Sequence, residues 1–280
     1  MTYNELRRRL AHCYDEGEAK AIARLVYEVR YGLTLADLCI GKDTQLSAND
    51  QAELAEIARR LEQREPVQYV LGVADFCGRQ LEVDSRVLIP RPETEELCRW
   101  LLDALAAEHT QGDGQRLLDI GTGSGCIAIT LAAALPRAVV TAWDISPGAL
   151  TVARRNARRH HVAVTFQQED ALKPASTARY DIMVSNPPYI LNKERARMDA
   201  NVLDYEPHTA LFVPDDDGLL FYRAIARHAL TALDAGGWLY FEINPLCADA
   251  LQQLLRDMGY GHVDTRRDQF GKLRMLRARR

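Results

Sequence analysis

The sequence predicts an α/β fold, in which a mostly parallel sheet is covered by helices on both faces and is preceded by a small N-terminal helical bundle. Two observations carry this prediction. Residues 1–70 contain apolar residues at helical spacing, with no strand pattern between them. After Gly114, short apolar runs alternate with helical patterns, and this order is typical of a parallel sheet whose strands are joined by crossover helices.

The N-terminal segment, residues 1–70, is predicted to be a helical bundle. Ser47, with Asp50 three residues later, is typical of a helix N-terminus, because the two side chains can cap each other's backbone N–H groups. The apolar residues within 54–61 would then share one face of the following helix, and Pro66 is expected to end it.

Residues 71–92 are expected to form a β-hairpin linker. Gly72 and Gly78 separate short β-like runs, and Pro90 and Pro92 come just before the next helix. The β-like runs cover 69–71, 81–83 and 87–89.

Residues 93–280 are predicted to form the second domain, with the alternating elements of an α/β sheet. Its expected helices cover 93–108, 126–134, 147–159, 219–233 and 248–258, and its expected strands cover 117–120, 139–144, 162–167, 180–185 and 238–243. Two last segments, 262–265 and 273–277, are expected to pair as antiparallel edge strands.

Composition and charge exclude several classes of protein. No apolar run is long enough to cross a bilayer, and the charged N-terminus lacks the apolar stretch of a secretion signal, so we expect a cytoplasmic protein without membrane contact. The six cysteines form no C-x-x-C pair, so no metal site is expected. The 35 basic and 39 acidic side chains give a formal net charge of −4, which argues against direct binding of DNA.

A glycine-rich loop follows the first predicted strand of the second domain. It reads Asp-x-Gly-x-Gly-x-Gly, and glycines allow a ligand to lie against the backbone because they tolerate positive φ and have no side chain. A dinucleotide site is the competing interpretation, but Cys126 stands where its third glycine belongs. The loop comprises Asp119, Gly121, Thr122, Gly123, Ser124 and Gly125.

Three acidic residues lie at the ends of three successive predicted strands. Asp119 suits a cofactor that carries a cationic sulfonium and an amino group. Asp144 stands where a carboxylate reaches ribose hydroxyls in folds of this type. Asp170, with Ala171 beside it, could meet the amino group of adenine. Together they predict a nucleoside-bearing cofactor, although each acid alone could be a helix cap or a surface charge.

The predicted strand at 180–185 leads into Asn186-Pro187-Pro188-Tyr189. Two prolines can simply make a rigid turn, but that interpretation does not explain an amide and an aromatic ring on either side of them. A planar amide or arylamine nitrogen is a weak nucleophile because its lone pair is delocalised, and a site that accepts both of its hydrogens can hold it for methylation. The Asn186 side-chain oxygen and the Pro187 main-chain oxygen are such acceptors, and Tyr189 offers a ring for stacking.

These motifs resemble a known family. Asn186 to Tyr189 after the glycine loop is similar to the amino-methyltransferases, which act on adenine, cytosine or glutamine amide nitrogens. The flanking segments resemble the release factor glutamine methyltransferases, the HemK/PrmC family, over nearly the whole chain. The matching segments are 65–72, Phe76, 88–95, 205–207, Ala210, Leu211, Asp268, Gly271 and Arg274.

The resemblance implies a Rossmann-like, seven-stranded class I methyltransferase domain that uses S-adenosyl-L-methionine. It also implies that the N-terminal bundle helps to bind peptide chain release factors, whose Gly-Gly-Gln glutamine receives the methyl group. By position, the family's cofactor residues fall on 121–125, Asp144 and Ala171, with Asn186 bordering the methionine part. The glutamine site falls on 186–189, namely Asn186, Pro187, Pro188 and Tyr189.

The sequence departs from the family at two places and leaves other substrates open. Ala171 stands where some members have a bulky aromatic residue, and Asn244 stands where glycine is common. A ribosomal-protein glutamine methyltransferase, an adenine-N6 nucleic acid methyltransferase and a noncatalytic binding module are the alternatives. Arg91, Glu93 and Glu206 have no assigned role at this stage.

Overall fold

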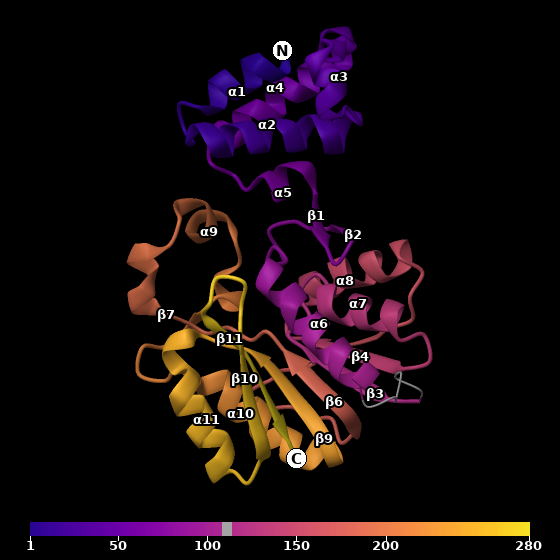
Figure 1. Ribbon diagram of the computed structural model, residues 1–280, viewed down its shortest axis with the longest axis vertical. Helices are drawn as coiled ribbons and strands as arrows, with labels where there is room; N and C mark the ends of the chain where they lie inside the picture. Colours follow the sequence, from indigo (N-terminus) through magenta and orange to yellow (C-terminus); the bar gives the residue numbers. More distant parts are fainter. Residues whose placement is uncertain (108–113) are drawn as a thin grey trace. The chain divides into compact units, whose positions relative to one another are not determined.

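A computed structural model describes residues 1–107 and 114–280 of the chain (Figure 1). The described chain divides into two compact units. The first unit comprises Met1–Val73 together with the later segment Asp199–Tyr205, and the second comprises Ala74–Met198 and Glu206–Arg280. No helix among these residues is both long and apolar enough to cross a membrane.

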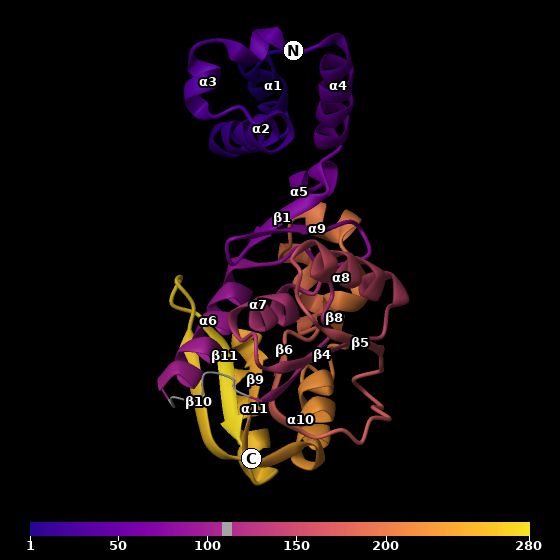
Figure 2. The ribbon, with the colours of Figure 1, turned by 90° about the vertical axis from the view of Figure 1, so that its right-hand side faces the viewer.

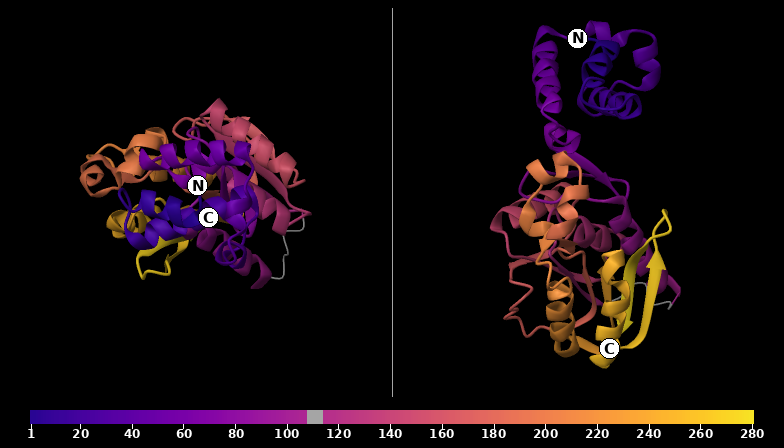
Figure 3. Two further views of the ribbon diagram at one scale, coloured as in Figure 1. Left: turned by 90° about the horizontal axis from the view of Figure 1, so that it is seen from above. Right: turned by 90° about the vertical axis from the view of Figure 1, so that its left-hand side faces the viewer.

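The first unit is a helical bundle around its own apolar core (Figure 2, Figure 3). Its first four α-helices each start after a residue whose side chain accepts a hydrogen bond from a backbone N–H of the first turn. The reciprocal cap between Ser47 and Asp50, predicted from the sequence, is confirmed. The core includes Leu6, Val26 and Leu54. The helices are α1 (Tyr3–Leu10), α2 (Glu16–Tyr31), α3 (Leu35–Cys39), η1 (Lys42–Gln45), α4 (Ala48–Glu62), α5 (Val67–Leu71) and α9 (Ala200–Tyr205).

Helix α9 belongs to the first unit although it lies between strands of the second in the sequence, and it was not predicted. The Tyr205 hydroxyl donates a hydrogen bond of 2.8 Å to the main-chain oxygen of Gln63, just after α4. The segment that carries α9 is therefore tied to the bundle by a specific polar contact. No local pattern in the sequence reports a contact between residues so far apart.

Three local predictions for residues 60–90 were wrong. Helix α4 ends at Glu62, before Pro66. The run 69–71 lies in helix α5, which begins after Pro66 and ends at Gly72 with a φ of 74°. The hairpin consists of β1 (Val73–Phe76) and β2 (Arg79–Glu82), whereas 87–89 is not a strand.

The second unit contains a seven-stranded sheet in the order β10-β11-β9-β6-β3-β4-β5. Five strands are parallel, β11 runs antiparallel to β9, and β10 runs antiparallel to β11. The predicted antiparallel pair therefore exists, but only β10 is at the edge, because β11 lies between β10 and β9. The strands are β3 (Arg116–Ile120), β4 (Val139–Asp144), β5 (Thr165–Gln168), β6 (Tyr180–Ser185), β9 (Leu233–Glu242), β10 (Gly261–Arg267) and β11 (Leu273–Arg279).

Helices cover both faces of this sheet (Figure 1). Leu118 of β3 packs with the helices α10 and α11, and its neighbour Leu117 packs on the other face with α6 and α7. The α/β fold with a preceding helical bundle is thus confirmed. The helices are α6 (Pro92–Ala107), α7 (Cys126–Ala134), α8 (Pro147–Arg159), α10 (Leu220–Ala232) and α11 (Ala248–Asp257). Residue 108, the predicted end of α6, lies outside the described residues.

The segment between β6 and α10 has short elements that the sequence did not predict. Strands β7 (Ile190–Leu191) and β8 (Phe212–Val213) pair in parallel, apart from the main sheet. The 3-10 helices η2 (Asn192–Arg197) and η3 (His208–Ala210) lie between them, and η4 (Pro245–Cys247) follows β9.

Candidate active site

A cavity of about 610 Å³ opens at the carboxyl ends of β3, β4 and β6. The chain adds β4 and β5 on one side of β3 and then β6 on the other, so the strand order reverses here, where ligands bind in folds of this type. The volume is within the range of small-molecule sites. The lining residues include Gly121, Gly123, Asp144, Ile145, Asp170, Ala171, Asn186, Pro187 and Pro188.

The three glycines of the loop after β3 have different surroundings. Gly121 and Gly123 have φ values of 75° and 55°, and a Cβ built on either would meet no atom within 4 Å. A Cβ on Gly125 would lie 2.9 Å from Ile129 Cδ1 and 3.2 Å from Ala153 Cβ. The first two glycines therefore leave space for a ligand beside the backbone, whereas Gly125 allows α7 and α8 to approach each other.

Asp119 lies enclosed beneath this loop and is not among the cavity-lining residues that the structure describes. Its Oδ2 accepts hydrogen bonds from Thr122 Oγ1 at 2.6 Å and from the Ala128 N–H at 3.2 Å. Its buried Oδ1 has no hydrogen-bond partner within the described chain. Burial raises the pKa of Asp119 to about 7. Thr122, like Ser124, is buried and does not line the described part of the cavity wall.

Asp144 faces the cavity from the end of β4. Its Oδ2 accepts a hydrogen bond of 2.8 Å from the Gly123 N–H, and its Oδ1 accepts one of 2.9 Å from the Ser146 N–H. Burial raises the pKa of this carboxyl above its ordinary value. The same side chain thus positions the glycine loop and presents a carboxylate to the cavity.

Three further residues line the cavity near the ends of β4 and β5. Asp170 and Ala171 come after β5, and Asp170 Oδ1 accepts a hydrogen bond of 2.8 Å from the Leu172 N–H. Ile145 directly follows Asp144 and is 59% exposed, an unusual exposure for a large apolar side chain beside a cavity. The sequence analysis missed Ile145, although an apolar residue directly after a strand-end aspartate was the available signal.

Asn186, Pro187 and Pro188 also line the cavity, where β6 ends. The Ser185 hydroxyl donates to the main-chain oxygen of Ile120 at 2.7 Å, which holds the ends of β6 and β3 together. These contacts bring the glycine loop and the proline turn to one edge of the sheet.

Two buried side chains that the sequence analysis did not single out hold the turn. Asn186 Nδ2 donates to Thr94 Oγ1 at 3.1 Å, and the Thr94 hydroxyl donates to Glu242 Oε2 at 2.6 Å. The Tyr189 hydroxyl donates to Glu242 Oε1 at 2.9 Å. Tyr189 is not among the described residues that line the cavity. Its hydroxyl is engaged by the carboxylate, and its ring packs partly buried against the core.

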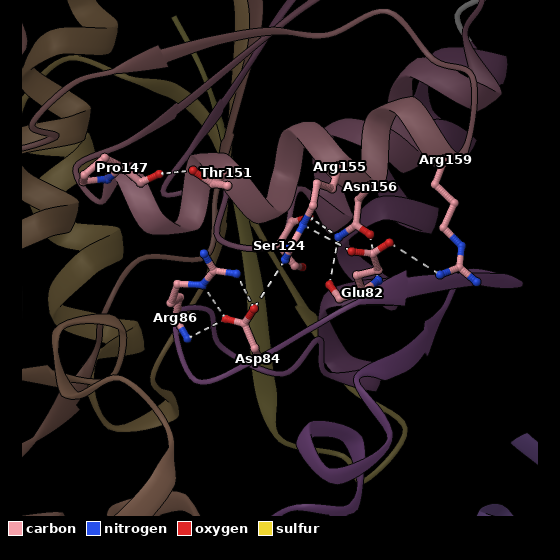
Figure 4. A network of polar contacts seen from close by, with 9 residues as sticks. All are labelled: Glu82, Asp84, Arg86, Ser124, Pro147, Thr151, Arg155, Asn156 and Arg159. Atoms are coloured by element: carbon pink, nitrogen blue, oxygen red, sulfur yellow. Dashed lines mark hydrogen bonds and ion pairs between the residues drawn. The ribbon is translucent and has the colours of Figure 1, made fainter. Parts of the chain in front are cut away.

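Polar contacts with α8 hold Glu82 and Asp84, which lead into the cavity-lining residues 86–88 (Figure 4). The fully buried Asn156 donates to the main-chain oxygens of Glu82 and Ser124, both at 2.9 Å, and accepts from the Glu82 N–H at 2.7 Å. Arg155 forms ion pairs with Glu82 and Asp84. Asn156 therefore joins β2, the glycine loop and α8 by one amide.

An ion pair connects two further parts of the cavity wall. Glu206, which is buried, pairs with Arg91 and also accepts a hydrogen bond of 3.2 Å from the Ile89 N–H. The residues just before Ile89 and those just after Glu206 line the cavity. Arg91 and Glu206, two of the three residues left without a role by the sequence analysis, thus link two segments of the wall.

The cavity combines features that fit a nucleoside cofactor with a positive charge. Open space beside the glycine backbone and the carboxylate of Asp144 suit a ribose. The Oδ1 of Asp119, which has no partner within the described chain, provides negative charge beneath the loop when this carboxyl is ionised. At the end of β6, Asn186 and Pro187 line the same cavity. This arrangement suits transfer of a group between two bound molecules.

Comparisons with known proteins agree with this geometry. Residues 2–72 match the PrmC N-terminal domain and residues 94–204 match the methyltransferase small domain. A release factor glutamine methyltransferase of Bacteroides thetaiotaomicron is 46% identical over 277 residues, covering 98% of each chain. One of Flavobacterium psychrophilum is 39% identical, covering 96% of this chain and 94% of the relative. A solved methyltransferase structure from Pyrococcus furiosus has a TM-score of 0.53 at 18% identity, covering 83% of this chain and 98% of that chain, and shares the fold.

Proposed function

The chain belongs to the family of release factor glutamine methyltransferases, and from this premise we propose what it methylates and with which residues. It transfers a methyl group from S-adenosyl-L-methionine to the side-chain amide nitrogen of the glutamine in the Gly-Gly-Gln motif of bacterial peptide chain release factors. The observation that carries this proposal is the Asn186 amide at the cavity, held by hydrogen bonding at its nitrogen.

The cofactor side of the cavity is formed by the strand ends of β3, β4 and β5. Asp144 binds the ribose hydroxyls, and Asp170 with Ala171 lies at the adenine. The glycine loop, with Gly121 and Gly123, contacts the cofactor through its backbone, and the charge of Asp119 lies beneath it. The bound cofactor supplies an electrophilic methyl group on a sulfonium.

The substrate side is formed by the turn from Asn186 to Tyr189. An amide nitrogen carries two hydrogens, and Asn186 Oδ1 with the main-chain oxygen of Pro187 accepts both of them. These acceptors hold the nitrogen in line with the methyl group, and positioning of this kind can supply several kcal/mol. Pro188 stiffens the turn, and Tyr189 is bound to Glu242 and thereby fixes the end of the turn.

Three segments of the chain have different tasks in this proposal. Residues 1–70 help to bind the release factor, residues 71–92 are the linker, and residues 93–280 carry the methyl transfer. The enzyme works in the cytoplasm on a protein substrate, without binding DNA. The alternative, methylation of a glutamine in a ribosomal protein, would use the same chemistry on a different protein substrate.

Peptide mass spectrometry tests the proposal. The purified chain is incubated with S-adenosyl-L-methionine and a recombinant release factor, and the methylated residue is mapped. One methyl group on the Gly-Gly-Gln glutamine is expected, and it is expected to be absent with Asn186→Ala. Asn192→Ala is the matched control, because Asn192 is exposed and is not one of the described lining residues.

A negative result is informative when cofactor binding is measured in the same sample by calorimetry. Binding without methylation of any release factor contradicts the proposed substrate and directs the search to ribosomal proteins and nucleic acid. Methylation by Asn186→Ala at the rate of Asn192→Ala contradicts the amide-binding role of Asn186.

A further inference from the structure

Glu242 ends β9 and connects to the turn at 186–189 through both of its carboxylate oxygens. One oxygen accepts from the Thr94 hydroxyl at 2.6 Å and the other from the Tyr189 hydroxyl at 2.9 Å. Thr94 Oγ1 accepts in turn from Asn186 Nδ2 at 3.1 Å. Glu242 and Thr94 are only 1% and 2% exposed, so these bonds form with little competition from water.

The order of the hydrogens along this chain follows from the charge of Glu242. A carboxylate can only accept hydrogen bonds, so both hydroxyls must donate to it. Thr94 has a single hydroxyl hydrogen, and because it is donated to Glu242, Thr94 can only accept from Asn186. The group of Asn186 that faces Thr94 must therefore be the NH2, and the Oδ1 atom is turned to the other side of the amide.

The orientation of this amide decides what the cavity can bind. A substrate amide nitrogen presents two hydrogens and needs acceptors. With the opposite orientation, the NH2 of Asn186 would face those hydrogens and repel them. A neutral amide can rotate between the two orientations unless its partner distinguishes them.

We propose that Glu242 and Thr94 are positioning residues, which hold the Asn186 carboxamide with its oxygen toward the substrate and thereby set the site's preference for a nitrogen that carries two hydrogens. This inference rests on the proposed function, in which Asn186 Oδ1 accepts from the substrate amide.

The hydrogen-bonded chain from Glu242 through Thr94 to Asn186 is called the relay below. The backbone around it is fixed by other contacts. Asn244 Nδ2 donates to the main-chain oxygen of Tyr189 at 3.0 Å. The Tyr222 hydroxyl donates to the main-chain oxygen of Glu242 at 3.2 Å. The Asn244 side chain therefore joins the segment after β9 to the turn without Thr94, so Thr94 can be altered without detaching them.

The relay works only while Glu242 is ionised. Burial raises the pKa of Glu242, and Glu93 of α6 acts in the same direction, whereas Thr94, Tyr189 and Arg274 of β11 lower it. Protonated Glu242 could donate to Thr94, whose own hydrogen would then be free to turn toward Asn186. The turnover rate is therefore expected to fall on the acid side, as the pH drops through the raised pKa.

Kinetics of two matched variants test the relay. Thr94→Val keeps the shape and removes the hydroxyl, and we expect kcat to fall by about ten- to a hundred-fold. Kd for the cofactor should change by less than about two-fold, since Thr94 is not among the described residues that line the cavity. KM for the release factor is expected to rise by a smaller factor than kcat falls, because only one amide contact to the substrate is lost. Thr94→Ser restores the hydroxyl and should restore most of kcat. Equal kcat for the valine and serine variants overturns the inference.

The pH profile separates a relay from a purely structural contact. The acid limb of kcat that reports Glu242 should persist in Thr94→Ser and should be absent from the residual activity of Thr94→Val. If the acid limb of kcat lies at the same pH in Thr94→Val as in the wild type, the charge of Glu242 does not act on Asn186 through Thr94.

Neutron diffraction of the wild-type protein tests the order of hydrogens without any variant or substrate. Deuterium is expected on Asn186 Nδ2 facing Thr94, and on Thr94 Oγ1 facing Glu242. The reverse order overturns the inference, even if no release factor is methylated and the proposed function itself fails.

Discussion

Replacement of Gly125 by alanine is expected to destabilise the second unit by about 2–5 kcal/mol, because two separate costs occur at this position. Its φ of 84° lies in the left-handed region, where a residue with a side chain costs about 1–2 kcal/mol. The new Cβ would lie 2.9 Å from Ile129 Cδ1 and 3.2 Å from Ala153 Cβ, and overpacking of this kind costs about 1–3 kcal/mol.

Gly121→Ala is the matched control, because it has the same backbone cost without the packing cost. Its φ is 75° and no atom lies within 4 Å of the added Cβ, so about 1–2 kcal/mol is expected. Urea denaturation followed by tryptophan fluorescence is the assay, since all three tryptophans lie in the second unit. Equal losses of stability in the two variants would refute the packing role of Gly125. Cofactor affinity should fall more in Gly121→Ala, whose Cβ would enter the cavity.

The same methods test three further side chains. Asn156→Ala leaves buried backbone groups of Glu82 and Ser124 unpaired and should cost about 2–4 kcal/mol in denaturation; a loss below about 1 kcal/mol contradicts this. Because the pKa of Asp119 is raised from 3.8 to about 7, its carboxyl becomes increasingly unfavourable to the fold as pH rises through that interval. Asp119→Asn should therefore gain stability relative to the wild type there, by up to about 4 kcal/mol, and parallel pH curves would argue otherwise. Asp144→Ala should weaken cofactor binding in calorimetry, and an unchanged Kd speaks against its ribose role.

Elements with strong local signals were predicted to the residue. Helix α7, strand β4 and helix α8 begin and end where the sequence indicates. Strand β4 is a run of apolar residues that ends at Asp144, and α8 begins with Ser146 as its cap and Pro147 in its first turn. Each of these signals lies within the element or next to it, so a single sequence contains them.

Elements that depend on distant contacts were not predicted. The run 87–89 is apolar and resembles a strand, but its first two residues line the cavity and the Ile89 N–H donates to Glu206, 117 residues later. Strands β7 and β8 have two residues each, which is too short for an alternating pattern.

The candidate site shows the same division. The strand-end acids and the proline turn could be predicted to meet, because the carboxyl ends of parallel strands lie at one edge of a sheet. Thr94 and Glu242 could not be paired in this way, since they are 148 residues apart and join a helix to a strand by side chains alone. The local signal was an acidic residue in the otherwise apolar run 238–243, since an acidic residue is rarely buried without a partner.

Binding of a cationic cofactor should release protons from the strand-end carboxyls. Asp119 has a buried oxygen without a partner among residues 1–107 and 114–280 and a pKa of about 7, so near neutral pH it is partly protonated without a ligand. A nearby positive charge favours the ionised form, so the proton leaves when the sulfonium binds. Calorimetry at pH 7 in buffers of different ionisation enthalpy measures this release. More protons should be released by S-adenosyl-L-methionine than by its thioether product, which lacks the sulfonium charge. Asp119→Asn should remove the difference, and a difference that persists in this variant assigns the proton to another group.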